Sequence, residues 1–247
     1  MSTDILSEIR DAIPATSPRR DESIRRAFHV LPSLDRPRIL DIGCGRGGPT
    51  LELARLSRGE VVGLDIRQCD LDELERAAAE AGLSDRVKAV NRSMFDIDFP
   101  DESFDIVWAE GSIFVIGFER GLREWRRLIK PRRFLVVHAA TWLRADPPRE
   151  MLAAWRESMY PGTLTVAECA ELVPSCGYDL LDHFALPEDF WWHEYFGPLQ
   201  QCIEGLRRKY PNDADALRVL DEQQRNIDIY RKYPQWYGSA YFVMRKS

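Results

Sequence analysis

The feature that most constrains the fold is a short apolar segment that ends in a run of glycines. Residues 38–48 read RILDIGCGRGG, and residues 49–57 then follow a helical pattern. A β-branched run of this length is typical of a buried strand, and glycines at its end allow a tight turn into the helix. Because the first N–H groups of that helix have no partner within it, the loop favours a nearby ligand. The alternative is a tight turn that binds nothing.

Strand-like and helix-like segments continue to alternate for about 100 residues. The further strand-like runs are residues 61–66, 87–91, 104–110 and 134–140. Helical patterns lie between them, and one of them, from Leu71 to Ala81, is expected to be capped by Asp70 with Glu73 and to end near Gly82. Parallel strands need crossover connections, which helices supply, so the alternation predicts a doubly wound α/β sheet.

The segments outside this alternation are predicted to be mostly helical. Residues 4–12 and 20–31 read as amphipathic helices of an N-terminal cap that spans residues 1–35. Asp146 is expected to cap a helix that begins at the following prolines, and a further helix is expected over 165–174.

Two more strands are predicted after residue 140, at 178–186 and 241–246. The aromatic-rich sequence between them is too long for a hairpin loop and is therefore expected to form an insertion. The prediction is a single domain of residues 1–247. It has a seven-stranded sheet with helical insertions at 141–164 and 187–238.

Composition and charge exclude several classes of protein. The 247 residues hold 34 Lys and Arg against 40 Asp and Glu, a net charge of −6, which argues against a nucleic-acid partner. The basic run from Arg123 to Arg133 is interleaved with acids and reads as a solvated helix face. No apolar stretch is long enough for a membrane helix, and the first residues lack the apolar core of a secretory signal. Five cysteines without a CxxC pair predict reduced thiols in a cytoplasmic protein and no metal site.

The glycine loop alone does not decide which nucleotide would bind. Gly43, Gly45 and Gly48 satisfy the GxGxxG pattern of dinucleotide-binding proteins. Asp41, however, stands just before the first glycine, where it would repel a pyrophosphate and attract the ammonium of an amino acid. Asp65 ends the second strand, where a carboxylate can accept hydrogen bonds from a ribose diol. No YxxxK pair is present for hydride chemistry of the short-chain dehydrogenase type.

Three segments resemble motifs of class I S-adenosylmethionine-dependent methyltransferases. They are LDIGCGRGG, VVGLDI and FPDESFDIVWAEGS, and the resemblance covers about residues 36–140. The motifs resemble those of the branch that contains the ubiquinone and menaquinone C-methyltransferases and many small-molecule enzymes. The resemblance implies that the doubly wound sheet is Rossmann-like and parallel except for an antiparallel last strand. It also implies S-adenosylmethionine as the cofactor and a methyl transfer of the EC 2.1.1 type to a small molecule.

The resemblance also assigns roles to residues at the cofactor. Gly43, Cys44 and Gly45 would lie beneath the methionine part with Asp41 nearby, Asp65 would hold the ribose, and Ile66 would flank the adenine. Ser93, followed by Met94, occupies a position at which many relatives carry an acid for the adenine amino group. Asp96, one turn away, is a possible substitute. Glu110 would face the cleft beside the reacting methyl.

The acceptor side rests on weaker patterns. Glu110 is a candidate base or orienting group, and the alternative is a carboxylate that binds only the cofactor's ammonium or a backbone amide. For His138, inside the fifth strand, a buried structural role is favoured over catalysis.

The segment FWWHEYF, residues 190–196, is a candidate lid that presents His193 or Tyr195 to the substrate, with internal packing or a homodimer contact as alternatives. The other substrate-binding candidates are Trp142, Trp192 and Tyr237.

The sequence therefore predicts a methyltransferase that acts on a small-molecule acceptor by in-line displacement, with O, N, C and S acceptors all possible. A catalytically inactive S-adenosylmethionine-binding regulatory or scaffold protein is the alternative. A nucleic-acid or protein methyltransferase is disfavoured. The chain has no basic extension, and it reads AEGS where a (D/N)PP(Y/F) tetrapeptide would stand.

Overall fold

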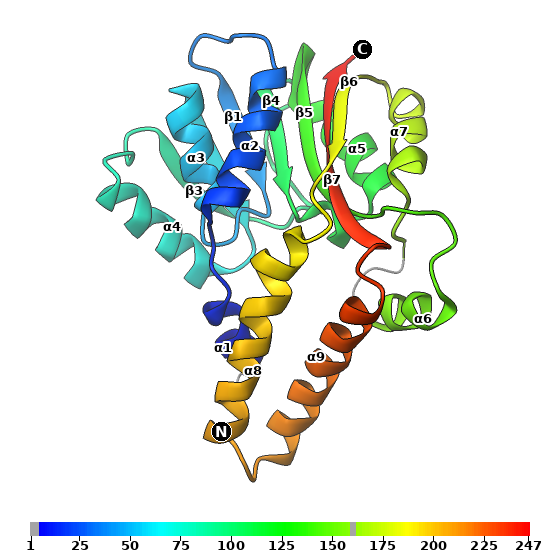
Figure 1. Cartoon of the computed structure of the whole chain (residues 1–247). Helices are drawn as coiled ribbons and strands as arrows, with labels where there is room; N and C mark the ends of the chain where they lie inside the picture. Colours follow the sequence, from blue (N-terminus) through cyan, green and yellow to red (C-terminus); the bar gives the residue numbers. More distant parts are fainter. Residues whose placement is uncertain (1–4, 159–161) are drawn as a thin grey trace.

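The computed structural model of the chain describes residues 5–158 and 162–247. Its centre is a seven-stranded sheet with the strand order β3-β2-β1-β4-β5-β7-β6 (Figure 1). The strands are β1 (Arg38–Ile42), β2 (Glu60–Asp65), β3 (Val87–Asn91), β4 (Phe104–Glu110), β5 (Ile129–Trp142), β6 (Tyr178–Ala185) and β7 (Tyr237–Lys246). Strand β7 is antiparallel to both its neighbours, while the pairs from β3 to β5 are parallel. The predicted fold class is confirmed.

Helices cover both faces of the sheet. They are α1 (Ile5–Ala12), α2 (Pro18–Val30), α3 (Gly48–Ser57), α4 (Gln68–Glu80), α5 (Phe118–Trp125), α6 (Arg149–Ser158), α7 (Val166–Ser175), α8 (Gly197–Lys209) and α9 (Ala214–Lys232). Two short 3₁₀ turns, η1 (Ile113–Val115) and η2 (Arg126–Leu128), and a π-helical turn, η3 (Trp192–Phe196), complete the described elements. Helices α2, α3 and α4 pack on one face, and α5 and α7 pack on the other.

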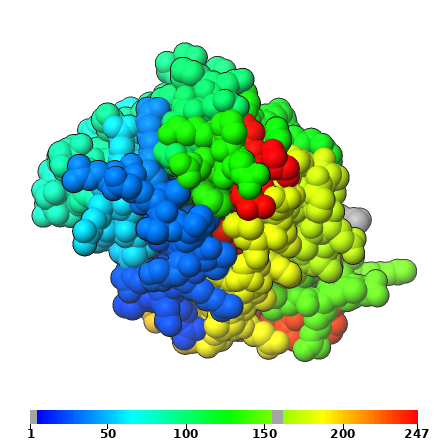
Figure 2. All heavy atoms as spheres, turned by 90° about the horizontal axis from the view of Figure 1, so that it is seen from above, coloured from blue at the N-terminus to red at the C-terminus, as the bar shows by residue number. Residues whose placement is uncertain are grey.

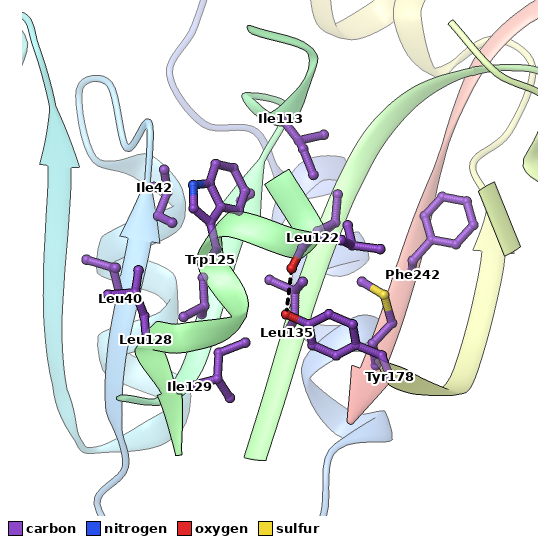
Figure 3. Close-up of a cluster of buried hydrophobic side chains, with 14 of the residues drawn as sticks. Leu40, Ile42, Ile113, Leu122, Trp125, Leu128, Ile129, Leu135, Tyr178 and Phe242 are labelled. Atoms are coloured by element: carbon purple, nitrogen blue, oxygen red, sulfur yellow. Dashed lines mark hydrogen bonds between the residues drawn. The ribbon is translucent and has the colours of Figure 1, made fainter. Parts of the chain in front are cut away.

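The two faces of the sheet carry two separate cores, because successive side chains of a strand point to opposite sides. In β4, Ile106 and Trp108 belong to the core under α2–α4, whereas Val107 and Ala109 belong to the core under α5 and α7. Figure 3 shows the second core. There the Tyr178 hydroxyl donates a 3.0 Å hydrogen bond to the Leu122 carbonyl, which satisfies an otherwise buried polar group.

Four helices extend beyond one edge of the sheet, and we call them the cap: α1, α6, α8 and α9. Helices α8 and α9 form an antiparallel pair, with α1 beside α8 and α6 beside α9 (Figure 1). They bury a third core that includes Ile9, Leu199, Ile203 and Leu220 and that reaches the sheet at Trp142. Figure 2 shows the opposite edge, where the C-terminal end of β7 (red) lies between the green and yellow segments that contain its neighbours β5 and β6.

No helix among residues 5–158 and 162–247 combines the length and the apolar character needed to span a bilayer.

Three local predictions were wrong. Helix α4 begins at Gln68 with Arg67 at its N-cap, so Asp70 is not the cap. Asp70 is instead buried in the first turn, 3.3 Å from Arg10 Nη1 and 3.4 Å from Arg67 Nε. Helix α6 begins at Arg149 rather than directly after Asp146. The fifth and seventh strands are longer than predicted, because Ile129 pairs with Phe104 and residues 141–142 pair with 237–238, within the extension of β7 over 237–240.

Candidate active site

The loop between β1 and α3 is held in a shape that leaves room for a ligand. Gly43 and Cys44 both donate backbone hydrogen bonds to the Leu64 carbonyl, at 2.7 and 3.1 Å. Gly43 has φ +75°, and a Cβ there would lie 2.5 Å from Ser112 Cβ, so no larger residue fits. At Gly45, by contrast, no heavy atom lies within 4 Å of the position that a Cβ would occupy. The loop is therefore packed at Gly43 and open at Gly45.

Asp41 lies directly before this loop and is completely buried. Its Oδ2 accepts a 2.7 Å hydrogen bond from Thr50 Oγ1, but its Oδ1 has no hydrogen-bond partner among the described residues. Burial raises the pKa of Asp41 to about 7, and the carboxylates of Glu110 and Asp65 add to this increase, while the Thr50 bond opposes it. A buried carboxylate with one unused oxygen is a site that favours a cation.

Asp65, at the end of β2, supports the loop. Its Oδ2 accepts a 3.0 Å hydrogen bond from the Gly45 N–H, and its Oδ1 accepts one from the Arg67 N–H. Partial burial raises its pKa, and the Asp70 carboxylate adds to this effect, although the Gly45 bond opposes it. The next residue, Ile66, is 67% exposed, which is unusual for a large apolar side chain in this protein. Asp65 and Ile66 thus present a polar and an apolar group at the same strand end.

Of the other residues predicted on the cofactor side, Met94 and Cys44 contact or belong to the loop. Met94 is partly buried, and its Cε lies 3.5 Å from the Cβ position of Gly43. Ser93 uses its hydroxyl locally, to accept a 3.2 Å bond from the Phe95 N–H. Cys44 is buried against Gly63, and burial raises the pKa of its thiol, so Cys44 is a packing residue of the loop.

Three side chains on neighbouring strands form what we call the strand-end cluster: Glu110, His138 and Tyr241. They are directly opposite one another in the registers of β4, β5 and β7. Glu110 Oε1 accepts a 2.7 Å bond from the Tyr241 hydroxyl and lies 2.8 Å from His138 Nδ1. Glu110 Oε2 accepts a 3.0 Å bond from Trp108 Nε1. The carboxylate therefore accepts two hydrogen bonds and lies in close contact with the His138 ring.

These contacts decide the charge of Glu110. Burial alone would raise its pKa, but the contact with His138 and the bonds from Tyr241 and Trp108 lower it below its ordinary value. The carboxylate is thus ionised at neutral pH. Burial and the same carboxylate together raise the pKa of Tyr241 well above its usual value, so this phenol keeps its proton.

Aromatic rings from the segment after β6 cover the cluster. The His138 ring is parallel to that of Tyr241, with centroids 4.7 Å apart, and nearly parallel to that of Trp191 at 6.2 Å. Phe190 meets it edge-on at 5.9 Å. His138 Nε2 is buried and has no hydrogen-bond partner among the described residues.

The predicted acceptor-side residues are only partly brought together. His193 is 53% exposed, with its Nε2 3.4 Å from Asp189 Oδ2. Tyr195 is partly buried beneath Trp191, and burial raises its pKa. Trp192 stacks on Tyr230 within the cap.

Trp142 and Tyr237 are opposite each other in the β5–β7 register, and their rings are in edge-to-face contact at 6.2 Å. They join the cap to the sheet. The roles assigned to the acceptor-side residues stay predictions, and so does the homodimer contact.

The N-terminal segment closes the site from the other side. Arg46 in the glycine loop donates to the Ile13 carbonyl and to the Arg10 carbonyl. Ser17, which caps α2, donates a 2.6 Å hydrogen bond to the buried Glu194 of η3. Residues 10–17 therefore connect the glycine loop to the segment that covers the strand-end cluster.

Sequence reasoning did not identify Thr50, Ser112, Trp108 or Tyr241. Thr50 and Ser112 contact the loop from α3 and from the end of β4, and the other two donate to Glu110. No local pattern marks these residues, since each acts across a strand pair or a helix–sheet contact. Alternation along β4 would have placed Trp108 and Glu110 on the same face.

Comparisons with known proteins agree with this geometry. Residues 39–132 match the family described as "Methyltransferase domain". The chain is 36% identical over 110 residues to sterol 24-C-methyltransferase ERG6B of Gibberella zeae. The aligned segment covers 44% of this chain and 28% of that protein. The chain is 31% identical over 131 residues to the 27-O-demethylrifamycin SV methyltransferase of Amycolatopsis mediterranei, covering 50% and 48%. The matches thus span less than half the length of either relative.

The fold is shared more widely than the sequence. A crystal structure of an S-adenosylmethionine-dependent methyltransferase from Geobacter sulfurreducens, in complex with S-adenosyl-L-homocysteine, superimposes with a TM-score of 0.81. The superposition covers 98% of each chain. Because the sequence identity is only 18%, this comparison concerns the fold alone. The family match and the motifs at Asp41 and Asp65 agree with it. Residues 39–132, less than half of the chain, thus match the methyltransferase domain family, and the chain as a whole shares its fold with S-adenosylmethionine-dependent methyltransferases.

Proposed function

We propose that this protein transfers a methyl group from S-adenosylmethionine to a small-molecule acceptor at the edge of the sheet where the parallel strands end. The observation that carries the proposal is the buried Asp41 carboxylate, whose Oδ1 lacks a hydrogen-bond partner among the described residues beside a loop that is open at Gly45. An amino-acid ammonium supplies the missing partner. A dinucleotide pyrophosphate would bring a second negative charge to the same place.

Three features of the site fit this cofactor. Asp41 suits its ammonium, Asp65 presents carboxylate oxygens to a ribose diol, and the exposed Ile66 offers an apolar surface to a base. Met94 adds a second apolar side chain at the loop. When bound, S-adenosylmethionine supplies an electrophilic methyl carbon on its sulfonium.

The strand-end cluster suits a residue pair that moves a proton. Glu110 is ionised and already accepts from Trp108 and Tyr241, so we assign it an orienting role. With Nδ1 facing Glu110, His138 offers Nε2 to a substrate proton. An acceptor hydroxyl or carbon acid needs such a base, whereas a neutral amine does not. Access to Nε2 requires Phe190 and Trp191 to move, which gives the segment 190–196 the role of a lid.

The names of two relatives describe different kinds of acceptor. The names of the two relatives give a carbon position of a sterol and a 27-O-demethylated rifamycin, so the chain resembles enzymes that act on different acceptors. Glu110 and His138 would serve oxygen or carbon acceptors better than an amine, because only these require removal of a proton from a weak acid.

Calorimetric titration with S-adenosylmethionine tests the proposal. We expect binding to the wild-type chain and weakening of about tenfold or more in Asp65→Ala, because each charge-assisted bond contributes on the order of 1.5–3 kcal/mol. Asp85→Ala is the matched control, since Asp85 is an exposed carboxylate in the turn before β3. Absence of binding, or equal weakening in both variants, would refute the cofactor assignment. Binding without methyl transfer across a metabolite library would favour a catalytically inactive binding protein.

A further inference from the structure

An apolar pocket lies next to the strand-end cluster, on the other face of the sheet. Its volume is about 280 Å³, and it is a partly open pocket lined by η1, the end of β5 and residues 162–169 around the start of α7. Figure 3 shows Ile113 of η1 at one end of the core, beyond Leu122 and Trp125. Ile116, Ala139, Leu164 and Cys169 are among its other lining residues. None of the described residues that line it is charged, although charged residues make up 30% of the chain.

Position connects this pocket to the proposed reaction. Ser112 touches Gly43 of the glycine loop, and the next residue, Ile113, lines the pocket. Likewise, Ala139 lines the pocket directly after His138 in β5. Gly111 links Glu110 of the cluster to Ser112 and Ile113 along the chain. A Cβ at Gly111 would lie 3.9 Å from His138 Nδ1, so this turn passes beside the cluster on its way to the pocket.

The side chains that line the pocket determine which kind of chemical group it can bind. Thr163 and Cys169 bring the side-chain heteroatoms, and burial raises the pKa of the Cys169 thiol to about 12, so it is neutral. A charged group placed there would lose its hydration without gaining a partner of opposite charge. The volume is roughly twice that of a 150 Å³ apolar cavity known to hold benzene. The pocket therefore suits an uncharged group of about one to two rings, or a branched hydrocarbon of that size.

We propose that this pocket binds an apolar part of the methyl acceptor, so that the acceptor is an amphiphilic molecule with a hydrocarbon or ring portion and a reactive group near Glu110 and His138. The inference rests on the proposed function for the identity of the ligand, but the pocket's preference is independent of the cofactor. A small zwitterionic acceptor, such as an amino acid, would leave the pocket unused.

Ethylbenzene is a suitable probe, because it is apolar and matches the expected size. Nuclear magnetic resonance titration of the protein without cofactor should show binding with a Kd of about 0.1–1 mM, as expected for eight carbon atoms in a good pocket. Intermolecular NOEs should connect the probe to the methyl groups of Ile113, Ile116 and Leu164. Ala139→Leu should weaken binding by about tenfold or more, because the added carbons occupy the pocket. Ala185→Leu, the same change at an exposed position of β6, should leave it unchanged.

Two results would overturn the proposal. One is a set of NOEs that connects ethylbenzene to exposed apolar residues such as Leu181 or Ile66 instead of the pocket. This measurement uses the wild-type protein and is therefore valid even if Ala139→Leu does not fold. The other is equal affinity in both leucine variants. S-adenosylmethionine binding is measured separately by calorimetry, so a chain that binds the cofactor but not ethylbenzene disproves only this inference. The reverse result disproves only the proposed function.

Discussion

Replacing Asp41 with asparagine should stabilise the unliganded protein at high pH and change it little at low pH. Burial, together with the carboxylates of Glu110 and Asp65, raises the pKa of Asp41 from 3.8 to about 7 in the folded protein. Between these two values the folded chain holds a proton that the unfolded chain has released, so stability falls as pH rises. At about 1.4 kcal/mol for each pH unit, the cost of the charge reaches about 4 kcal/mol above pH 7.

Asparagine keeps the shape of the side chain and avoids this cost. Its carbonyl can still accept from Thr50, and its amide replaces the protonated oxygen. The free energy of unfolding, measured by urea denaturation, should therefore differ more between variant and wild type at about pH 8.5 than at about pH 5. The expected increase is about 3 kcal/mol in favour of the variant. Asp85→Asn is the control and should show no such trend, because that carboxylate is exposed.

The same carboxylate predicts how cofactor affinity depends on pH. An ammonium beside Asp41 stabilises its ionised form, so S-adenosylhomocysteine should bind the wild type more tightly as pH rises from about 5 to 7, by up to tenfold per unit. Binding to Asp41→Asn should be weaker at about pH 8 and should lack this trend. A stability difference that is the same at both pH values would refute the reasoning about burial. A pH-independent wild-type affinity would refute the pairing with the ammonium.

Three further substitutions test other contacts of the site. Gly43→Ala should lower the free energy of unfolding by about 2–3 kcal/mol, because the new Cβ would approach Ser112 Cβ and φ at this position is +75°. Adding Ser112→Gly should recover part of this loss in urea denaturation. Absence of any recovery would contradict the packing of Gly43 against Ser112. Glu194→Ala removes the acceptor for the Ser17 hydroxyl, so hydrogen exchange in residues 10–17 should accelerate, and unchanged exchange would show that this bond does not hold the segment. Glu110→Gln should lower stability by about 3 kcal/mol or more while S-adenosylhomocysteine affinity falls less than tenfold, and a larger loss of affinity would place Glu110 on the cofactor.

The cofactor side of the site could be predicted because its residues belong to local patterns. Asp41 and Asp65 each stand at the end of a short apolar strand, and the ends of parallel strands meet at one edge of a sheet. Gly43 lies in the turn that the strand–loop–helix pattern requires. The parallel strands follow from the same alternation, whereas the antiparallel last strand was expected from the family resemblance. Such patterns depend on neighbours within a few residues, which the sequence states directly.

The contacts that set the chemistry of Glu110 are not local. Tyr241 is 131 positions away and reaches Glu110 only because β7 pairs with β5 in one register. The position of Asp70 also depends on a distant residue. Asp70 is buried because it forms an ion pair with Arg10 of α1, and not because it caps helix α4. Residues 129–133 contain a proline and three basic residues, so the sequence pattern did not predict that β5 begins at Ile129. In the structure, Ile129 pairs with Phe104 next to a bulge in the β4–β5 pairing. Tertiary pairing overrides local propensity in each case.

This difference divides the site into two parts that can change separately. The loop at Asp41, Gly45 and Asp65 is built within 30 residues and is held by its own backbone bonds to Leu64 and Gly45. The acceptor side is assembled from η1, the end of β5, the start of α7 and the segment at Phe190, which are far apart in the chain. Packing of the cap against Trp142 and Tyr237 positions that second part. Substitutions in the cap should therefore alter which acceptor is used before they alter cofactor affinity, and paired measurement of both quantities in cap variants would test this separation.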